Sequence, residues 1–187
     1  MSTPTNLEDQ LREMYGRAAY THKTHEKMAD EYVRRYKTIK TLEIVISAAA
    51  TGSLLLAVFG DSKAGTIVGA ALSTVLLGLT LFFKEASLAD QAQKHTVVAS
   101  KLWGIRERLL SLIVDMTDGR SVAEIREERD ALNEKLEDIY KGAPRTNSRA
   151  YAAAQKALKS HEELFFSATE LNKMLPEKLR RPSSLET

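Results

Sequence analysis

The sequence predicts an all-α protein, in which a two-span transmembrane helical hairpin continues into a cytoplasmic antiparallel coiled-coil stalk with C-terminal helices. Two uncharged apolar runs, residues 44–59 and 64–83, are separated by a short loop. Apolar residues recur at helical spacing on both sides of these runs, and the alternating pattern of a β-strand does not occur. We expect four segments: a long N-terminal cytoplasmic helix at 1–43, the transmembrane hairpin at 44–83, a cytoplasmic stalk helix at 84–117, and a C-terminal helical region with a tail at 118–187.

The N-terminal segment is expected to form one helix that runs from about Leu7 into the membrane. No proline interrupts it between Thr5 and the loop. Its apolar residues recur in steps near three and four, as in a heptad seam. They are Leu7, Leu11, Met14, Ala18, Met28, Tyr32, Ile39 and Leu42.

The two apolar runs have the length of membrane spans. At a rise of about 1.5 Å per residue, Ala64–Phe83 covers about 30 Å, the thickness of a hydrocarbon core. Ile44–Phe59 covers about 24 Å and reaches nearly full depth if residues 41–43 are added. The alternative is a buried hairpin in a soluble bundle, but the polar residues here are only Ser, Thr and Gly. This composition favours the membrane.

Charge predicts the orientation of the hairpin. Basic residues flank both spans, whereas the loop holds one Lys and one Asp, so the positive-inside rule places both termini in the cytoplasm. The absence of cysteine fits a reducing compartment. The first forty residues show no signal-peptide pattern. The flanking basic residues are Arg34, Arg35, Lys37 and Lys40 before the first span, and Lys84, Lys94 and Lys101 after the second.

The second stalk helix carries a matching seam and pairs with the first across the hairpin. Folding the chain about the loop places His25 near Val98 and His95 near Met28, so the two histidines are expected to be neighbours. Outward-facing Val97, Leu110 and Ile113 are left uncovered in a two-helix stalk, which predicts a homo-oligomer. The seam residues are Leu88, Gln91, His95, Val98, Leu102, Ile105, Leu109, Leu112 and Met116.

Two helices are expected after the stalk. Ser121 and Glu124 have the spacing of a capping box, and this helix should end at Gly142-Ala143-Pro144. The last helix should run from Asn147 or Ser148 to about Leu175, before Pro176. Its expected apolar anchors are Leu158, Leu164, Phe165 and Leu171.

The segment from His25 to Tyr32, the two spans with their short loop, and the segment from Ala92 to Trp103 together resemble the SLATT family. Its members are two-transmembrane effectors associated with nucleotide-dependent bacterial conflict systems. The resemblance covers about Leu7 to Met116, and some members carry a C-terminal helical extension. It implies a pore-forming effector of an anti-phage abortive-infection system in the bacterial inner (cytoplasmic) membrane. It also implies gating, either opening or holding closed, by a nucleotide-derived ligand or a partner.

The implied ligand is a nucleotide or oligonucleotide made by an associated nucleotidyltransferase. Since two spans per chain need several copies to enclose a channel, we expect a tetramer or larger. Two other classes remain open: a membrane-anchored helical scaffold that recruits a cytoplasmic partner, and a soluble helical-bundle adaptor.

The second span offers candidate pore-lining residues. Thr66, Ser73 and Thr80 are seven residues apart and share a face, with Leu77 beside them. Hydroxyls can replace water around a passing ion, but they also bridge packed helices, so both interpretations stay open. For Gly65 and the other small residues, close helix packing is favoured.

Basic residues in the C-terminal region are candidates for binding a nucleotide or another phosphate. The alternatives are a solvated face or attraction to anionic lipid, and the net charge of +2 is too small to indicate bulk nucleic-acid binding. The candidate phosphate-binding residues are Arg145, Arg149, Lys156, Arg180 and Arg181.

The histidines and the absence of catalytic motifs complete the functional interpretation. His22, His25 and His95 could suggest a metal ion, but no carboxylate or cysteine completes a ligand set, and a polar seam position or a pH sensor are the alternatives. Neither a cysteine, a Gly-x-Ser-x-Gly motif nor an HExxH motif occurs. We therefore expect no enzyme activity, no cofactor and no metal.

Overall fold

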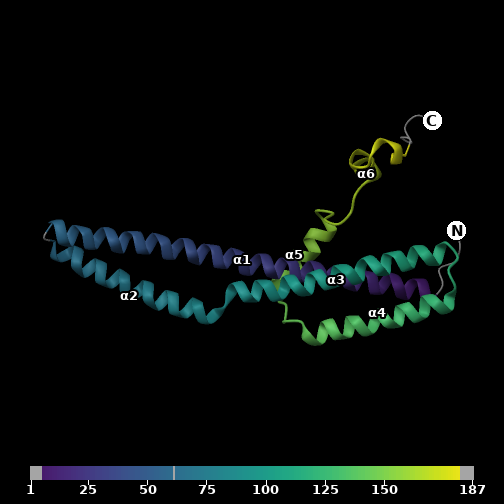
Figure 1. Cartoon of the computed structure of the whole chain (residues 1–187), viewed down its shortest axis with the longest axis horizontal. Coiled ribbons are helices and arrows are strands. Elements are labelled where there is room, and N and C mark those ends of the chain that lie inside the picture. The colour runs from purple at the N-terminus through teal and green to yellow at the C-terminus, as the bar shows by residue number, and fades with distance from the viewer. Residues whose placement is uncertain (1–5, 61, 182–187) are drawn as a thin grey trace.

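The computed structural model describes residues 6–60 and 62–181, and every regular element within them is helical, which confirms the all-α prediction. Figure 1 shows an elongated molecule with a two-helix hairpin at one end and a stalk of packed helices at the other. The elements are α1 (Asn6–Gly60), α2 (Lys63–Ala86), α3 (Leu88–Thr117), α4 (Val122–Gly142), α5 (Ser148–Lys159), α6 (Ala168–Met174) and the 3-10 helix η1 (Glu177–Leu179).

Helix α1 is continuous over 55 residues, as the unbroken N-terminal pattern predicts. At 1.5 Å per residue it is about 82 Å long, so one helix forms both the stalk and the first span. Helix α2 begins directly after the loop, where the Ser62 hydroxyl accepts a hydrogen bond from the Gly65 N–H at 3.1 Å. This cap satisfies one of the backbone donors that a helix start leaves free.

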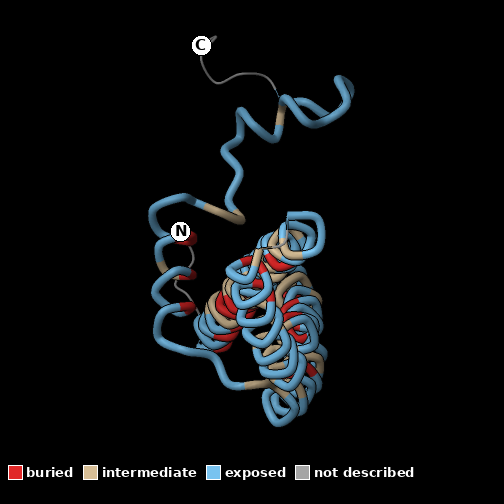
Figure 2. Tube along the Cα trace, turned by 90° about the vertical axis from the view of Figure 1, so that its left-hand side faces the viewer, coloured by how far each residue is buried: buried red, intermediate tan, exposed pale blue. Residues whose placement is uncertain are grey.

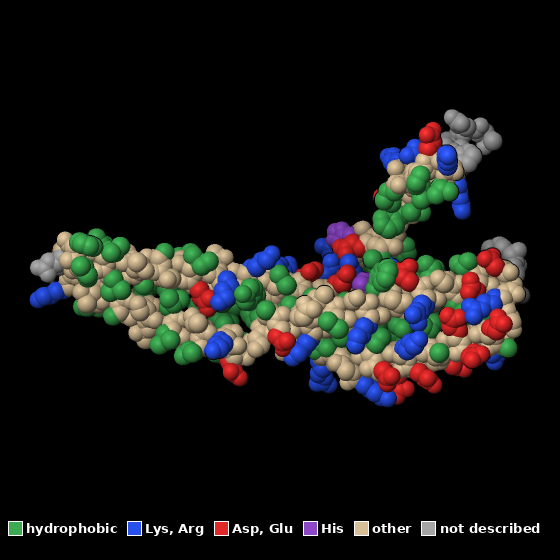
Figure 3. All heavy atoms as spheres, viewed as in Figure 1, with side chains coloured by type: hydrophobic (Ala, Val, Ile, Leu, Met, Phe, Trp, Pro, Cys, Tyr) green, Lys and Arg blue, Asp and Glu red, His purple; other side chains and the backbone are tan. Residues whose placement is uncertain are grey.

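The hairpin leaves its apolar surface uncovered. In each of its two most apolar stretches, only 6% of the residues are buried. Figure 3 shows hydrophobic side chains with few charges along the hairpin, whereas Lys, Arg, Asp and Glu cover the stalk. A hairpin in the core of a soluble protein would be mostly buried, so this exposure supports membrane spans.

The second half of the hairpin is bent, which the sequence does not predict. Ser87 separates α2 from α3 and has a left-handed backbone with φ of 46°. Its N–H donates to the Lys84 carbonyl at 3.4 Å, while its own carbonyl accepts from the Gln91 N–H at 3.0 Å. The second span and the stalk helix are therefore two separate helices, α2 and α3, which meet at an angle (Figure 1).

The stalk core lies where α1, α3 and α4 meet. The predicted seams of α1 and α3 provide most of it, and α4 adds Ile125, Leu132 and Leu136. Figure 2, a view along the molecule, shows these buried residues gathered inside the bundle. From α1 and α3 the core contains Leu7, Leu11, Met14, Ala18, Val98, Leu102, Ile105, Leu109 and Leu112.

Helix α4 changes which surfaces stay open. Ile113 was expected to face outward, but it packs against the core. Val97 and Leu110 are exposed as predicted, and Trp103 is exposed on the same helix. The predicted capping box at Ser121 is wrong, because this residue precedes α4 but its side chain makes no capping hydrogen bond.

The predicted single helix from residue 147 to residue 175 is also wrong. Helix α5 starts as expected, where the Asn147 side chain accepts from the Ala150 N–H at 2.7 Å. The helix ends at Lys159, and positive φ angles of 49° at Glu162 and 79° at Leu164 turn the chain away. Figures 1 and 2 show α6 standing apart from the stalk. As a consequence, the expected anchor Phe165 is exposed.

Candidate functional site

The two spans meet through glycines on α2. A Cβ atom added at Gly65 would lie 2.8 Å from the Ser53 carbonyl oxygen of α1. One added at Gly69 would lie 2.9 Å from a Leu54 methyl carbon. Both glycines are buried, so they allow the backbones of α1 and α2 to approach closely. The packing interpretation of these small residues is thus the one that the contacts support.

The candidate pore-lining residues lie on a different face of α2. Thr66 follows Gly65 by one position and is therefore rotated by about 100° from the α1-facing side. Thr66, Ser73, Leu77 and Thr80 are all exposed on the single chain. The Thr66 hydroxyl donates to the Ser62 carbonyl at 3.4 Å, so it is partly satisfied within its own helix. The exposure of these residues leaves this face open to a neighbouring copy, to lipid or to water, although Thr80 also borders a groove with Ile39 and Glu43 of α1.

A pair of buried histidines joins α1 and α3 in the middle of the stalk. The Nδ1 atoms of His25 and His95 are 2.8 Å apart, which confirms the predicted proximity. The Tyr32 ring stacks on His95 with 5.6 Å between ring centroids. Burial, together with the neighbouring His95 and His22, lowers the pKa of His25 to about 4, and burial also lowers the pKa of His95. Both rings are therefore neutral at pH 7.

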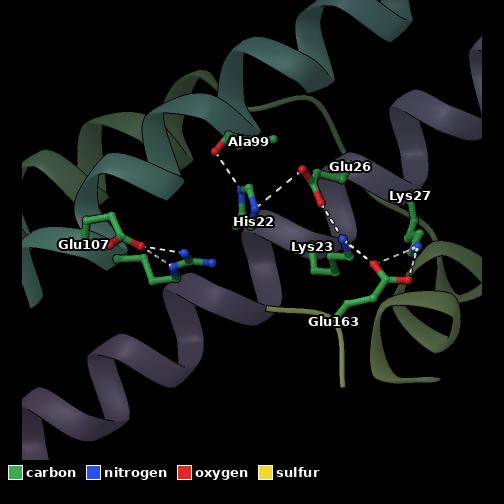
Figure 4. Close-up of polar contacts among 8 residues, drawn as sticks. His22, Lys23, Glu26, Lys27, Ala99, Glu107 and Glu163 are labelled. Carbon is green, nitrogen blue, oxygen red and sulfur yellow. Dashed lines mark hydrogen bonds and ion pairs between the residues drawn. The ribbon is translucent and has the colours of Figure 1, made fainter. Parts of the chain in front are cut away.

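A polar network surrounds His22, which lies three residues before His25 on α1 (Figure 4). The His22 Nδ1–H donates to the Ala99 carbonyl at 2.9 Å, and its Nε2 atom is 3.6 Å from a Glu26 carboxylate oxygen. Lys23 Nζ binds the other Glu26 oxygen at 2.7 Å and a Glu163 oxygen at 2.5 Å. Burial lowers the pKa of Lys23, but the contacts with Glu163 and Glu26 outweigh it, so the pKa is raised overall.

Glu163 fixes the end of α5 to the stalk. Its carboxylate forms ion pairs with Lys23 and with Lys27, and the Lys27 Nζ atom lies 3.2 Å from one carboxylate oxygen. These two lysines hold the pKa of the Glu163 carboxyl below its usual value, although burial opposes this. This pairing lies just after the point where α5 ends, in the segment where the sequence predicts that the helix continues.

Two predicted phosphate-binding residues lie on α5 and face different grooves along α1. Arg149 borders a groove with Arg34, Arg35 and Ile39 on α1. Lys156 borders a second groove with Lys27, Arg34 and Lys37, together with Asp30, His161 and Glu163.

The other three predicted phosphate-binding residues line neither groove. Arg145 is exposed in the connection before α5. Arg180 lies beyond α6, where its Nε–H donates to the Leu175 carbonyl at 2.9 Å. The Arg181 N–H donates to the Asn172 side chain at 3.0 Å, so it too belongs to the segment that stands apart. The structure therefore does not bring the five residues together.

The histidines do not form a metal centre in this arrangement. Within residues 6–60 and 62–181, no three His, Cys, Asp or Glu side chains gather in a way that could hold a metal ion. His25 and His95 instead contact each other, while His22 contacts a backbone carbonyl.

Sequence reasoning missed the network around Lys23. The Lys23–Glu26 pair has i,i+3 spacing and was visible as a helical ion pair. The contribution of Glu163 was not visible, because nothing in the local pattern links it to a lysine 140 positions earlier in the chain. The bend at Ser87 also lacks a sequence signal, since serine is not a residue that favours left-handed backbone.

Comparison with known families gives one match. The profile of the family described as "SMODS and SLOG-associating 2TM effector domain family 4" matches residues 7–170. Searches of curated proteins and of solved structures found no match.

Proposed function

This chain belongs to the SMODS and SLOG-associating 2TM effector domain family 4, one of the SLATT families, and from this premise we propose that its copies assemble into an ion-conducting pore. Membership makes the chain a two-transmembrane effector of a conflict system. The proposal adds that it acts by permeabilising the bacterial inner membrane during phage infection, with both termini in the cytoplasm and without catalysis.

The exposed hydroxyl face of α2 is the observation that carries the pore proposal. The hairpin packs through Gly65 and Gly69, whereas Thr66, Ser73 and Thr80 are exposed on the single chain. A ring of such faces would supply hydroxyl oxygens along the bore, while Leu77 would narrow it by dewetting. No Asp, Glu, Lys or Arg occurs within residues 64–83, so the selectivity of such a pore would not come from charge.

Uncovered apolar residues on the stalk support oligomerisation. Val97, Trp103, Leu110 and Val114 on α3 are 42–52% exposed. Exposed apolar faces of this kind mark protein contacts, and a stalk that self-associates would align the hairpins above it. We propose a tetramer or larger, since each chain contributes two spans.

The ligand site that we propose is the groove beside Lys156. Lys27, Arg34, Lys37 and Lys156 give it four cationic side chains, against the carboxylates of Asp30 and Glu163. Phosphate groups of a nucleotide or oligonucleotide are suitable partners for such a rim. Arg145, Arg180 and Arg181 could reach the same ligand only from another copy or after movement of the α6 segment.

A membrane-anchored scaffold is the second candidate. The segment after α5 favours it, because Phe165, Phe166, Met174 and Leu179 are at least 60% exposed and suit a protein partner at that end of the chain. A scaffold requires the hairpin only as an anchor and predicts no ion flux.

The experiment that separates these candidates is ion flux with substitutions on two faces of α2. The chain and its variants would be expressed in bacteria while membrane potential is followed by a potential-sensitive dye. Ser73→Trp should restore the potential by filling the bore. Val75→Trp is the matched control, because it lies about 200° further around the helix and is also exposed.

Depolarisation by the original chain and by Val75→Trp, but not by Ser73→Trp, is the expected result. Equal depolarisation by both variants would refute the assignment of this face. Membrane insertion of each variant, measured by detergent extraction, controls for loss of folding. Absence of depolarisation both with and without infection, for a chain that inserts correctly, would favour the scaffold.

A further inference from the structure

A groove with an apolar floor and a basic rim lies where the spans join the stalk. Its volume is about 480 Å³, and α1, the α2–α3 bend and α5 all contribute to it. Ile39, Phe83 and Leu88 supply the apolar side chains. Arg34 and Arg35 from α1 and Arg149 from α5 supply the cationic rim.

The bend at Ser87 explains why this apolar floor is open. A second groove shares the same three apolar residues and is also bordered by Tyr36, Lys40 and Lys84. Ile39, Phe83 and Leu88 therefore line both grooves, and all three are only half-buried. No side chain of the described residues fills the groove between α1 and the junction of α2 with α3.

Charge in the first groove favours an anion. Its cationic residues are Lys27, Arg34, Arg35 and Arg149, and its one carboxylate is Glu31, so the lining carries a net charge of +3 (four minus one). Arg35 forms an ion pair with Glu31, and the Arg149 guanidinium lies 3.6 Å from the same carboxylate. Arg34 and Lys27 retain their charge for another partner, although Lys27 also contacts Glu163.

The depth of the groove matches the headgroup layer of a bilayer. Phe83 is the last residue of the uncharged second run, so it marks the edge of the hydrocarbon core. Ile39 lies five residues before Ile44, or about 7.5 Å along α1. Since each headgroup layer is about 5–8 Å thick, the apolar floor lies at the level of this layer. A lipid whose phosphate binds the arginines would be drawn toward the stalk by about this thickness, so that its first acyl carbons lie on the floor.

We propose that this groove binds an anionic phospholipid of the leaflet on the stalk side. The phosphate would bind the arginine rim, since guanidinium groups donate paired hydrogen bonds to phosphate oxygens. The proximal part of an acyl chain would cover Ile39, Phe83 and Leu88. A free nucleotide shares the phosphate chemistry but has no acyl chain that continues into the hydrocarbon core. The inference depends on membrane insertion of the hairpin and is independent of ion conduction.

The test measures lipid retained by the full-length protein. The chain would be reconstituted into nanodiscs of phosphatidylglycerol and phosphatidylcholine in equal amounts and re-extracted in mild detergent, and its bound lipids would be counted by native mass spectrometry. Wild-type protein should retain phosphatidylglycerol in preference to phosphatidylcholine. The variant Arg34→Gln/Arg149→Gln should retain at least threefold less phosphatidylglycerol.

A matched control removes the same charge from the same two helices. Lys37→Gln/Lys156→Gln alters the neighbouring groove on α1 and α5 and should retain phosphatidylglycerol like the wild type. Ile39→Trp fills the apolar floor without changing charge and should also reduce retention. Circular dichroism establishes that each variant is folded.

Three results would overturn the proposal. Equal loss in both double variants would indicate a general surface-charge effect. Equal retention of both lipids would remove the anionic specificity. Displacement of the lipid by millimolar ATP or pyrophosphate from wild-type protein would assign the rim to a soluble phosphate ligand instead. Ion flux enters none of these readouts, so failure here would be distinct from failure of the pore proposal.

Discussion

Acidification is expected to open the stalk at the His25–His95 pair. The short contact between the two Nδ1 atoms requires that one of them be unprotonated and accept the hydrogen bond of the other. Once both rings are protonated, two N–H donors and two positive charges face each other in a buried site. Acid should therefore separate α1 from α3 near these residues.

The direction and size of this effect follow from the pKa of His25. Its ordinary pKa of 6.5 is lowered to about 4 by burial and by the neighbouring histidines. The pKa of His25 is lower in the closed stalk than in the opened one, so the opened stalk binds more protons. The stalk is therefore most stable against opening above pH 6.5. The difference corresponds to about 3 kcal/mol, which should be lost progressively as the pH falls from 6.5 to 4.

A distance measurement across the stalk would test this prediction. The chain contains no cysteine, so cysteines introduced at exposed Asp30 on α1 and Lys94 on α3 can carry spin labels at two defined sites. The distance distribution should be narrow at pH 7 and should broaden between pH 6.5 and 4. In His25→Leu/His95→Leu the distribution should stay narrow over the same range. Broadening of this variant at the same pH, or an unchanged wild type at pH 4, would refute the reasoning.

Other contacts give sharper local predictions. Gly65→Leu should separate the two spans, because overpacking against the α1 backbone costs about 1–3 kcal/mol; an unchanged yield of cysteine cross-links between α1 and α2 would contradict the close approach. Glu163→Gln should weaken the attachment of α5 by about 1 kcal/mol, since Lys23 keeps a second carboxylate. Hydrogen exchange at residues 160–167 should then accelerate, and Glu162→Gln should leave it unchanged. Ser87→Gly should stabilise the bend by about 0.5–1 kcal/mol, because glycine adopts a left-handed backbone without strain; a lower melting temperature for this variant would count against it.

Long local patterns were sufficient to predict the main architecture. An unbroken seam without proline predicts α1, and two uncharged runs around a short loop predict the hairpin. Counting residues back from the loop was enough to place His25 near His95, because α1 is unbroken and only Ser87 separates α2 from α3. These features depend on periodicity, which a sequence shows directly.

Features that depend on contacts between distant segments were not predictable in this way. Leu164 and Leu171 continue the helical spacing of α5, but the helix ends at Lys159, and Glu163 pairs with Lys23 and Lys27 of α1 in the turn that follows. The basic residues of α5 were visible as a charged set. Which groove each one borders depends on how α5 packs on α1, and charge pattern alone does not contain that information.

Because of the break at Ser87, the two helices of the hairpin are connected to the stalk in different ways. Torque applied to α1 in the stalk is carried by its unbroken backbone into the first span. The path from α3 to α2 is interrupted at Ser87, so we expect a rotation of the stalk to reach α2 through α1, at the tight backbone contacts of Gly65 and Gly69. These two glycines would then couple the stalk to the face proposed to line the pore.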